Sequence, residues 1–290
     1  MKQNGYAKGW MLFSPWIITF LVFWFFPLVY SLVISLTDYR LLDPSVDWIG
    51  FANYSKLFSD ADFISSLKNS FIFVIGTIPF TTAIALALAL LLNEKFKGRT
   101  FFRAAYFMPS ITSMVVIALI FSNLYARGGY LHLLADMIGL APPANGFLLS
   151  ENSALASIMA MDIWMASGYY MLLFLGGLQT IPTELYEAAT ISGASKWHQF
   201  RYITLPMLKP VTLFIIVINS IKSFQVFIEI FVMTKGGPLN STFTGVYFVY
   251  ENGLRKFDFG YASAAAYVLF AIIAIASVIQ FKFLKTEWKA

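Results

Sequence analysis

The feature that most restricts the fold of this chain is a series of long stretches without charged side chains. Four of them cover residues 9–37, 69–93, 104–126 and 259–281. A helix of roughly 20 residues crosses the apolar core of a bilayer, so each stretch is long enough to span a membrane. Two further apolar stretches, 152–183 and 210–234, contain only Asp162 in the first and Lys222 and Glu229 in the second. The sequence therefore predicts an all-α integral membrane protein with six transmembrane helices.

Composition supports this class. Charged residues make up 12% of the 290 residues and hydrophobic residues 59%, whereas soluble domains contain about 25% charged residues. Cysteine is absent, and the only histidines are His132 and His198. This composition excludes a disulfide framework and a thiolate metal site, and it argues against a metal site built from histidines. We expect no nucleic-acid partner and no metal or cofactor bound by this chain.

The basic residues in the loops predict the orientation. Segments 1–9, 94–103 and 179–209 and the tail from Lys282 carry twelve Lys and Arg residues, against seven on the opposite side. Basic residues concentrate in cytoplasmic loops, so both termini are expected in the cytoplasm. The first stretch is too long for a cleaved signal peptide and should persist as a helix. We treat 1–290 as a single transmembrane domain, with spans at about 10–36, 69–93, 104–126, 154–178, 210–233 and 260–281 and one long cytoplasmic loop at 179–209.

The cytoplasmic loop 179–209 has clear local signals. Pro182 and Glu184 suit the start of a helix and Gly193 suits its end, which predicts a short helix from about Thr183 to Ile191. Ser195 is placed to cap a second short helix that extends towards residue 201. Taken alone, this pattern is also that of a solvated amphipathic connector.

The loop resembles the EAA loop of binding-protein-dependent ABC importer permeases. The resemblance rests on Glu187-Ala188-Ala189, Gly193 and the run 203–206 with Pro210. It extends over nearly the whole chain, and it resembles the carbohydrate-uptake (maltose and glycerol-phosphate permease-like) branch at residues 16–27, 102–104, 178–182, 223–227 and 234–238. Ser192 departs from the pattern, because many members carry Asp there, and we expect it to change the hydrogen bonding of the loop. The resemblance implies the fold of a type I ABC importer permease.

The resemblance also implies a role for the loop. Its first short helix would be a coupling helix that docks on a cytoplasmic ATPase subunit, through Glu184, Leu185, Glu187, Ala188, Ala189 and Gly193. The chain contains no Gly-x-x-x-x-Gly-Lys-Ser/Thr motif, so it is expected to be a transport subunit and not an enzyme, with ATP and Mg²⁺ bound by partners. Those partners would be two ATPase subunits, a second and similar permease in a heterodimer, and an extracytoplasmic solute-binding protein. The implied location is the inner or plasma membrane of a prokaryote, where the chain is multi-pass and contacts lipid.

Polar residues inside the spans are candidates for the substrate path. Asp162, Ala166 and Tyr169 share one face of the fourth span by helical spacing, and Asn219 and Ser223 share a face of the fifth. By the resemblance, the positions that would line a central sugar cavity are Ser110, Met114, Asp162, Ala166, Tyr169, Asn219, Ser223 and Gln225. Such a wall combines hydroxyl-directed hydrogen bonds with flat apolar faces, as sugar recognition requires. The predicted function is permeation of an oligosaccharide or a glycerol-linked solute from the binding protein into the cytoplasm.

Other interpretations of these polar residues stay open at this stage. Asp162 and Lys222 could form an ion pair between helices, and Glu229 could lie in a solvated position near the outer interface. The Tyr and Ser residues could form hydrogen bonds that join neighbouring helices. An alternative function is an ion-coupled secondary sugar carrier that uses Asp162 and Lys222 as a relay, although it leaves the EAA loop without a purpose. An intramembrane enzyme is disfavoured because no span contains a histidine.

Overall fold

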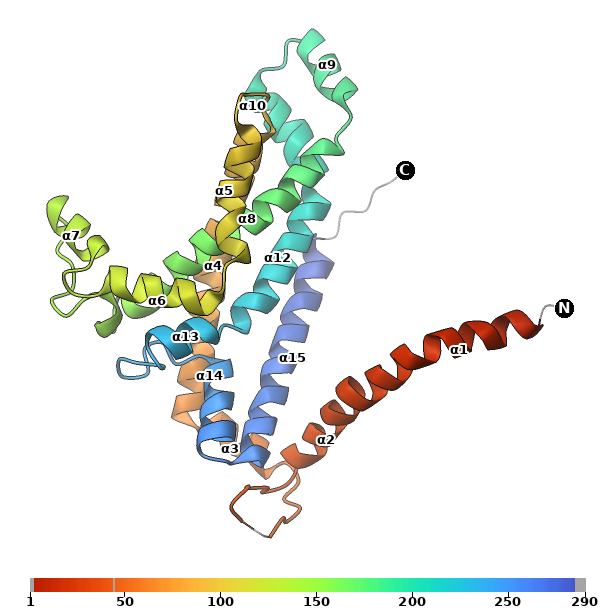
Figure 1. Ribbon diagram of the computed structural model, residues 1–290, viewed down its shortest axis with the longest axis vertical. Helices are drawn as coiled ribbons and strands as arrows, with labels where there is room; N and C mark the ends of the chain where they lie inside the picture. Colours follow the sequence, from red (N-terminus) through yellow and green to blue (C-terminus); the bar gives the residue numbers. More distant parts are fainter. Residues whose placement is uncertain (1–2, 44, 285–290) are drawn as a thin grey trace. The chain divides into compact units, whose positions relative to one another are not determined.

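The structure is a computed structural model that describes residues 3–43 and 45–284. Every regular element within these residues is a helix, which confirms the predicted all-α class. The chain divides into two compact units, one made of Met1–Ile64 and Phe248–Leu269 and the other of Ser65–Tyr247 and Phe270–Ala290. Each is described separately below, and the helices are labelled in Figure 1.

The first unit contains the first predicted span. The chain begins with α1 (Gln3–Phe20), passes through a π-helical turn at Leu21–Phe25 and continues as α2 (Phe26–Ser35). The most apolar window of Trp10–Ser35 has no buried residue, so this span presents its aromatic side chains outward. The unit also includes α3 (Ala52–Ser59), a π-helical turn at Glu251–Arg255 and the first part of α15 (Phe259–Leu284).

Polar contacts hold the loops of the first unit together. The amide nitrogen of Asn53 donates to the carbonyl oxygens of Ser35 and Thr37, at 3.0 and 2.8 Å. The hydroxyl of Tyr261 donates to the carboxylate of Asp60 at 2.6 Å, and the ammonium of Lys56 lies 4.1 Å from the centre of the Tyr261 ring. These contacts fix α3 against the start of α15.

The second unit contains most of the remaining helices. Its elements are α4 (Ala61–Asn93, which starts in the first unit), α5 (Arg99–Ile111), α6 (Met114–Tyr125), α7 (Tyr130–Met137), α8 (Ala154–Gln179), α9 (Thr183–Ile191), α10 (Lys196–Gln199), α11 (Leu205–Met207), α12 (Lys209–Phe224), α13 (Ile228–Met233) and α14 (Gly245–Tyr250, which ends in the first). Its core includes the C-terminal halves of α4 and α8 together with the start of α12. The buried side chains are Ala85, Ala89, Leu92, Tyr170, Met171, Phe174, Leu175, Leu178, Ile181, Leu208 and Ile215.

Two predicted spans are not continuous helices. The third, expected at 104–126, bends by 95° between α5 and α6. The bend falls where Thr112 and Ser113 take extended backbone angles, just after Pro109. The fifth, expected at 210–233, is interrupted between α12 and α13, where Gln225 to Phe227 leave the helix. Broken helices of this kind are tolerated at membrane depth where the freed backbone lines a cavity or lies within protein.

Close packing joins α5 to α8 and α6 to α13. Figure 1 shows α5 running alongside α8, and the two helices are in extensive contact. A Cβ atom at Gly168 of α8 would overlap the carbonyl oxygen of Tyr106 on α5, so a side chain at this position would push the helices apart. After the bend, α6 packs against α13. The bend and the interruption therefore bring the two irregular segments to the same region of the second unit.

Candidate functional site

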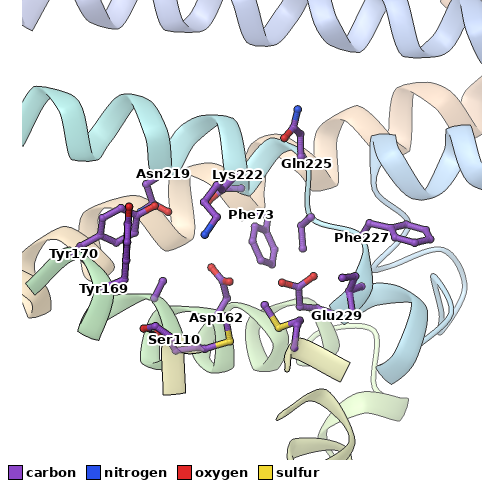
Figure 2. Close-up of a pocket in the computed structure, with 16 residues that line it drawn as sticks. Phe73, Ser110, Asp162, Tyr169, Tyr170, Asn219, Lys222, Gln225, Phe227 and Glu229 are labelled. Carbon is purple, nitrogen blue, oxygen red and sulfur yellow. Dashed lines mark hydrogen bonds between the residues drawn. The ribbon is translucent and has the colours of Figure 1, made fainter. Parts of the chain in front are cut away.

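A cavity of about 670 Å³ lies within the second unit, bounded by α4, α5, α6, α8, α12 and α13. Figure 2 shows sixteen residues that line it. They are Phe73, Ser110, Met114, Asp162, Met165, Ala166, Tyr169, Tyr170, Asn219, Lys222, Ser223, Gln225, Val226, Phe227, Ile228 and Glu229. All eight predicted substrate-path residues are among them, and the structure thus brings together residues from four separate helices and the break after α12.

The wall contributed by α8 follows from helical spacing. Asp162, Ala166 and Tyr169 are separated by four and three residues, so they fall on one face of an unbroken helix. The structure places all three on the cavity wall. Tyr169 remains 39% exposed, and its ring packs edge-on against Tyr170, with 5.3 Å between ring centres.

The opposite wall comes from the interrupted fifth span. Asn219, Lys222 and Ser223 lie on the last two turns of α12, and Glu229 lies on the first turn of α13. Gln225 caps the end of α12, where its backbone N–H bonds to the carbonyl oxygens of Ile221 and Lys222. Figure 2 shows the Gln225 amide pointing away from the carboxylates of Asp162 and Glu229. Gln225 therefore directs its side chain away from this charged part of the cavity.

Three ionisable side chains share the cavity. Figure 2 shows the ammonium of Lys222 pointing from α12 towards the side on which Asp162 and Glu229 lie. The ion pair between Asp162 and Lys222, one of the interpretations of the sequence, is not among the ion pairs of the described residues. Lys222 lies 5.8 Å from the centre of the Tyr169 ring. Glu229 is buried at 7% exposure, so its side chain is not solvated as one interpretation of the sequence required.

The hydroxyl groups on the wall are engaged between helices. Ser110 of α5 donates to the carbonyl oxygen of Met165 on α8 at 2.7 Å, and the Ser223 hydroxyl lies 3.1 Å from that of Thr77 on α4. Both serines therefore tie helices together as well as facing the cavity. In contrast, the amide nitrogen of Asn219 and the hydroxyl of Tyr170 are buried and have no hydrogen-bond partner in the described protein. Unlike the two serine hydroxyls, these two polar groups are not engaged by a neighbouring helix.

Half of the residues that line the cavity were not predicted from the sequence to belong to the substrate path. The additional residues are Phe73, Met165, Tyr170, Lys222, Val226, Phe227, Ile228 and Glu229. Lys222 and Glu229 had a signal, because a charge inside an apolar stretch is costly and normally faces a cavity or a partner. Apolar residues such as Phe73 and Ile228 carry no such signal in sequence.

The predicted coupling loop has the expected local structure. The helix α9 covers Thr183–Ile191, Gly193 has a φ of 78°, and Ser195 caps α10 by accepting a bond from the backbone N–H of His198 at 3.3 Å. The second short helix continues as a π-helical turn at Phe200–Thr204. Figure 1 shows α9 at the far end of α8 from α6. Among the six predicted coupling residues, Glu184, Leu185, Glu187, Ala188 and Gly193 are exposed and Ala189 is half-buried.

Hydrogen bonds within the loop join α9 to the segment that follows it. The hydroxyl of Tyr186 lies 2.9 Å from that of Thr204, and the amide nitrogen of Gln199 donates to the hydroxyl of Thr190 at 3.0 Å. Ser192, the departure from the EAA pattern, donates to the carbonyl oxygen of Ala188 at 2.9 Å. Ser192 therefore bonds back to α9.

Comparisons with known proteins agree with this architecture. A family model described as a binding-protein-dependent transport system inner membrane component matches residues 81–285. The chain is 33% identical over 285 residues to the lactose transport system permease protein LacF of Rhizobium radiobacter, which covers 97% of this chain and 95% of LacF. It is 35% identical over 274 residues to the arabinooligosaccharides transport system permease protein AraP of Halalkalibacterium halodurans, which covers 93% and 85%.

A solved structure shares the fold. The chain matches a chain in the structure of a bacterial alginate ABC transporter in complex with an alginate pentasaccharide-bound periplasmic protein, with a TM-score of 0.83, 23% identity and coverage of 98% of this chain and 99% of that one. The predicted permease fold is therefore confirmed. The family match and the two permease relatives together establish that this chain belongs to the inner membrane components of binding-protein-dependent transport systems.

Proposed function

We propose that this chain forms part of the translocation path of an ATP-driven importer, and that it carries an oligosaccharide or a glycerol-linked solute into the cytoplasm. The names of two relatives support a sugar substrate, because LacF belongs to a lactose transport system and AraP to an arabinooligosaccharides transport system. Each aligns along nearly the whole of this chain.

The observation that carries the proposal is the mixed character of the cavity wall. Tyr169 and Phe73 offer flat apolar faces, while Asp162, Asn219 and Lys222 offer hydrogen-bonding groups in the same cavity. A sugar presents apolar ring faces and a rim of hydroxyl groups, so it needs both kinds of contact. Polar groups inside a membrane span are costly, and a polar substrate path accounts for their presence.

The proposal includes the partners that the chain needs. ATP hydrolysis takes place on two ATPase subunits, and one of them docks on α9 of this chain, where Glu187 is exposed and available for a charge-assisted bond. A second, similar permease completes the path, and an extracytoplasmic binding protein delivers the solute. The alginate transporter, which has the same fold, binds such a protein. Docking of the ATPase at α9 places both termini in the cytoplasm, in agreement with the distribution of Lys and Arg.

The connectivity of α8 and α9 supports an alternating-access mechanism. The helix α8 contains Asp162 and Tyr169 and ends at Gln179, and α9 follows after three residues. Closure of the ATPase dimer would move α9, and the rigid α8 would transmit that movement to the cavity wall. Rigid-body rocking of this kind is an established form of conformational change.

Affinity purification of the tagged chain from native membranes tests the proposal. We expect an ATPase subunit and a second permease to be retained, and both uptake of radiolabelled sugar and ATPase retention to be lost in Glu187→Arg. Glu151→Arg is the matched control, because it makes the same charge change at an exposed residue before α8. Recovery of the chain alone, with sugar uptake intact in cells lacking ATP, would contradict the proposal.

A further inference from the structure

The cavity contains a cluster of unlike charges. Asp162 on α8, Lys222 on α12 and Glu229 on α13 all line it, and the described residues contain no ion pair between any two of them. Figure 2 shows that Lys222 extends into the space that both carboxyl groups border. Charges within membrane-spanning segments normally pair with one another or face a cavity. The cavity of about 670 Å³ that they line leaves room for a ligand among them.

The charges do not balance. In its fully ionised form the cluster has two carboxylates and one ammonium, a formal excess of one negative charge. An ionised carboxylate can only accept hydrogen bonds, whereas a sugar hydroxyl can donate one and accept another. A hydroxyl therefore fits beside Asp162 or Glu229. The carboxylate of a uronic acid does not, because it can only accept and is repelled by charges of the same sign.

A second, independent observation points to a polar ligand that can accept hydrogen bonds. Asn219 and Tyr170 are 2% and 1% exposed and line the same cavity. The amide nitrogen of Asn219 and the hydroxyl of Tyr170 have no hydrogen-bond partner in the described protein. A buried polar group without a partner is costly, and a ligand hydroxyl would satisfy either of them. The cavity thus supplies donors beside its excess of acceptors.

Resting on the proposed function, we infer that this cavity accepts neutral oligosaccharides and rejects those that contain uronic acids. Asp162 and Glu229 are the specificity-determining residues in this inference. Lys222 offsets one of their charges. Removal of the two carboxylate charges would leave Lys222 uncompensated, and the cavity would then attract an acidic sugar.

Direct binding to the assembled importer tests this inference. The complex with its partner subunits is placed in nanodiscs without the binding protein, so that only the permease selects the sugar. Equilibrium dialysis then compares radiolabelled maltotriose, arabinotriose and trigalacturonate. We expect the wild type to bind a neutral trisaccharide at least about tenfold more tightly than trigalacturonate. In the Asp162→Asn/Glu229→Gln variant, this affinity ratio should shift by about tenfold or more towards trigalacturonate, because two unit charges across the cavity are removed.

The controls separate this inference from the proposed function. If the double variant does not assemble, the single variants Asp162→Asn and Glu229→Gln replace it. Each should shift the ratio of the two affinities in the same direction. Asp136→Asn removes a carboxylate charge on α7, outside the cavity, and should leave the ratio unchanged. A wild-type preference for trigalacturonate, or a ratio that the cavity variants do not shift, overturns the inference and leaves sugar import standing. Binding of no trisaccharide overturns both.

Discussion

The hydroxyl of Tyr186 on α9 lies 2.9 Å from the hydroxyl of Thr204, in the π-helical turn that leads through α11 into α12. The exposed helix α9 is thus bonded to the segment that precedes α12. Because α12 carries Asn219 and Lys222 on its later turns, a displacement of α9 has a direct structural route to the cavity wall. This route runs beside the covalent one through α8.

Tyr186→Phe is expected to weaken coupling between ATP hydrolysis and transport. The substitution keeps the ring and removes the hydroxyl, and one hydrogen bond contributes about 1 kcal/mol. We expect the amount of sugar transported per ATP hydrolysed to fall by about three- to fivefold in proteoliposomes that contain the complete importer, as that free energy implies. Tyr202→Phe is the control, because Tyr202 lies in the same turn and is 70% exposed. Equal coupling in the two variants would show that the bond to Thr204 has no part in transmission.

Gly168→Ala is expected to destabilise the contact between α5 and α8. The added Cβ atom would overlap the backbone carbonyl of Tyr106, which cannot rotate away as a side chain would. Overpacking of this kind costs about 1–3 kcal/mol, and thermal unfolding of the purified protein in detergent measures it. Gly176→Ala on the same helix has no atom within 4 Å of its new Cβ and should unfold at or above the wild-type temperature, since Ala favours helices. Equal losses in both variants would contradict the close approach of the helices.

The sequence predicts those elements of the fold whose signals come from residues close together in the chain. The short helix Thr183–Ile191, the left-handed Gly193 and the Ser195 cap were all predicted, because each depends on residues a few positions apart. The bend at Thr112 was missed, because 104–126 contains no charge and no strong break signal after Pro109. What stabilises the bend is packing of α6 on α13, a contact between segments about 110 residues apart in the chain.

The same distinction explains the site. Helical spacing was enough to place Asp162, Ala166 and Tyr169 on one wall, since α8 is unbroken. Helical spacing was not enough to place Glu229, because residues Gln225–Phe227 interrupt the helix and Glu229 lies on the separate helix that follows. Sequence also cannot show that the Ser223 hydroxyl forms a hydrogen bond with Thr77, while the Asn219 amide nitrogen has no partner. These differences arise from which helix lies opposite, and that is decided by tertiary packing.

Asn219→Leu and Ser223→Ala are expected to have opposite effects. Asn219→Leu removes a buried amide whose nitrogen has no partner, so thermal stability should not fall, while the apparent affinity for transported sugar falls about tenfold with the loss of a ligand contact. Ser223→Ala breaks the bond to Thr77 and should lower the free energy of unfolding by about 1 kcal/mol. Uptake kinetics and thermal unfolding, measured on both variants, separate the two roles. A loss of stability in Asn219→Leu with unchanged uptake would assign that side chain to packing.

The Tyr261 hydroxyl should make the stability of the first unit depend on pH. Burial would raise the pKa of Asp60, but the hydrogen bond from Tyr261, those from the backbone N–H groups of Phe63 and Asp62 and the charge of Lys56 outweigh it and lower the pKa below its usual 3.8. A carboxyl group whose pKa is lower in the folded state stabilises the fold above the unfolded pKa, and this contribution is lost as the pH falls through the folded pKa.

Tyr261→Phe is therefore expected to be less stable than the wild type at pH 7, and the difference should shrink as the pH falls below about 4, where Asp60 takes up a proton. Thermal unfolding in detergent at pH 7, 5 and 3.5 measures it. Tyr39→Phe, which also removes a tyrosine hydroxyl in the first unit, should differ from the wild type by the same amount at each pH. A Tyr261→Phe difference that stays constant down to pH 3.5 would mean that this hydroxyl does not stabilise the ionised form of Asp60.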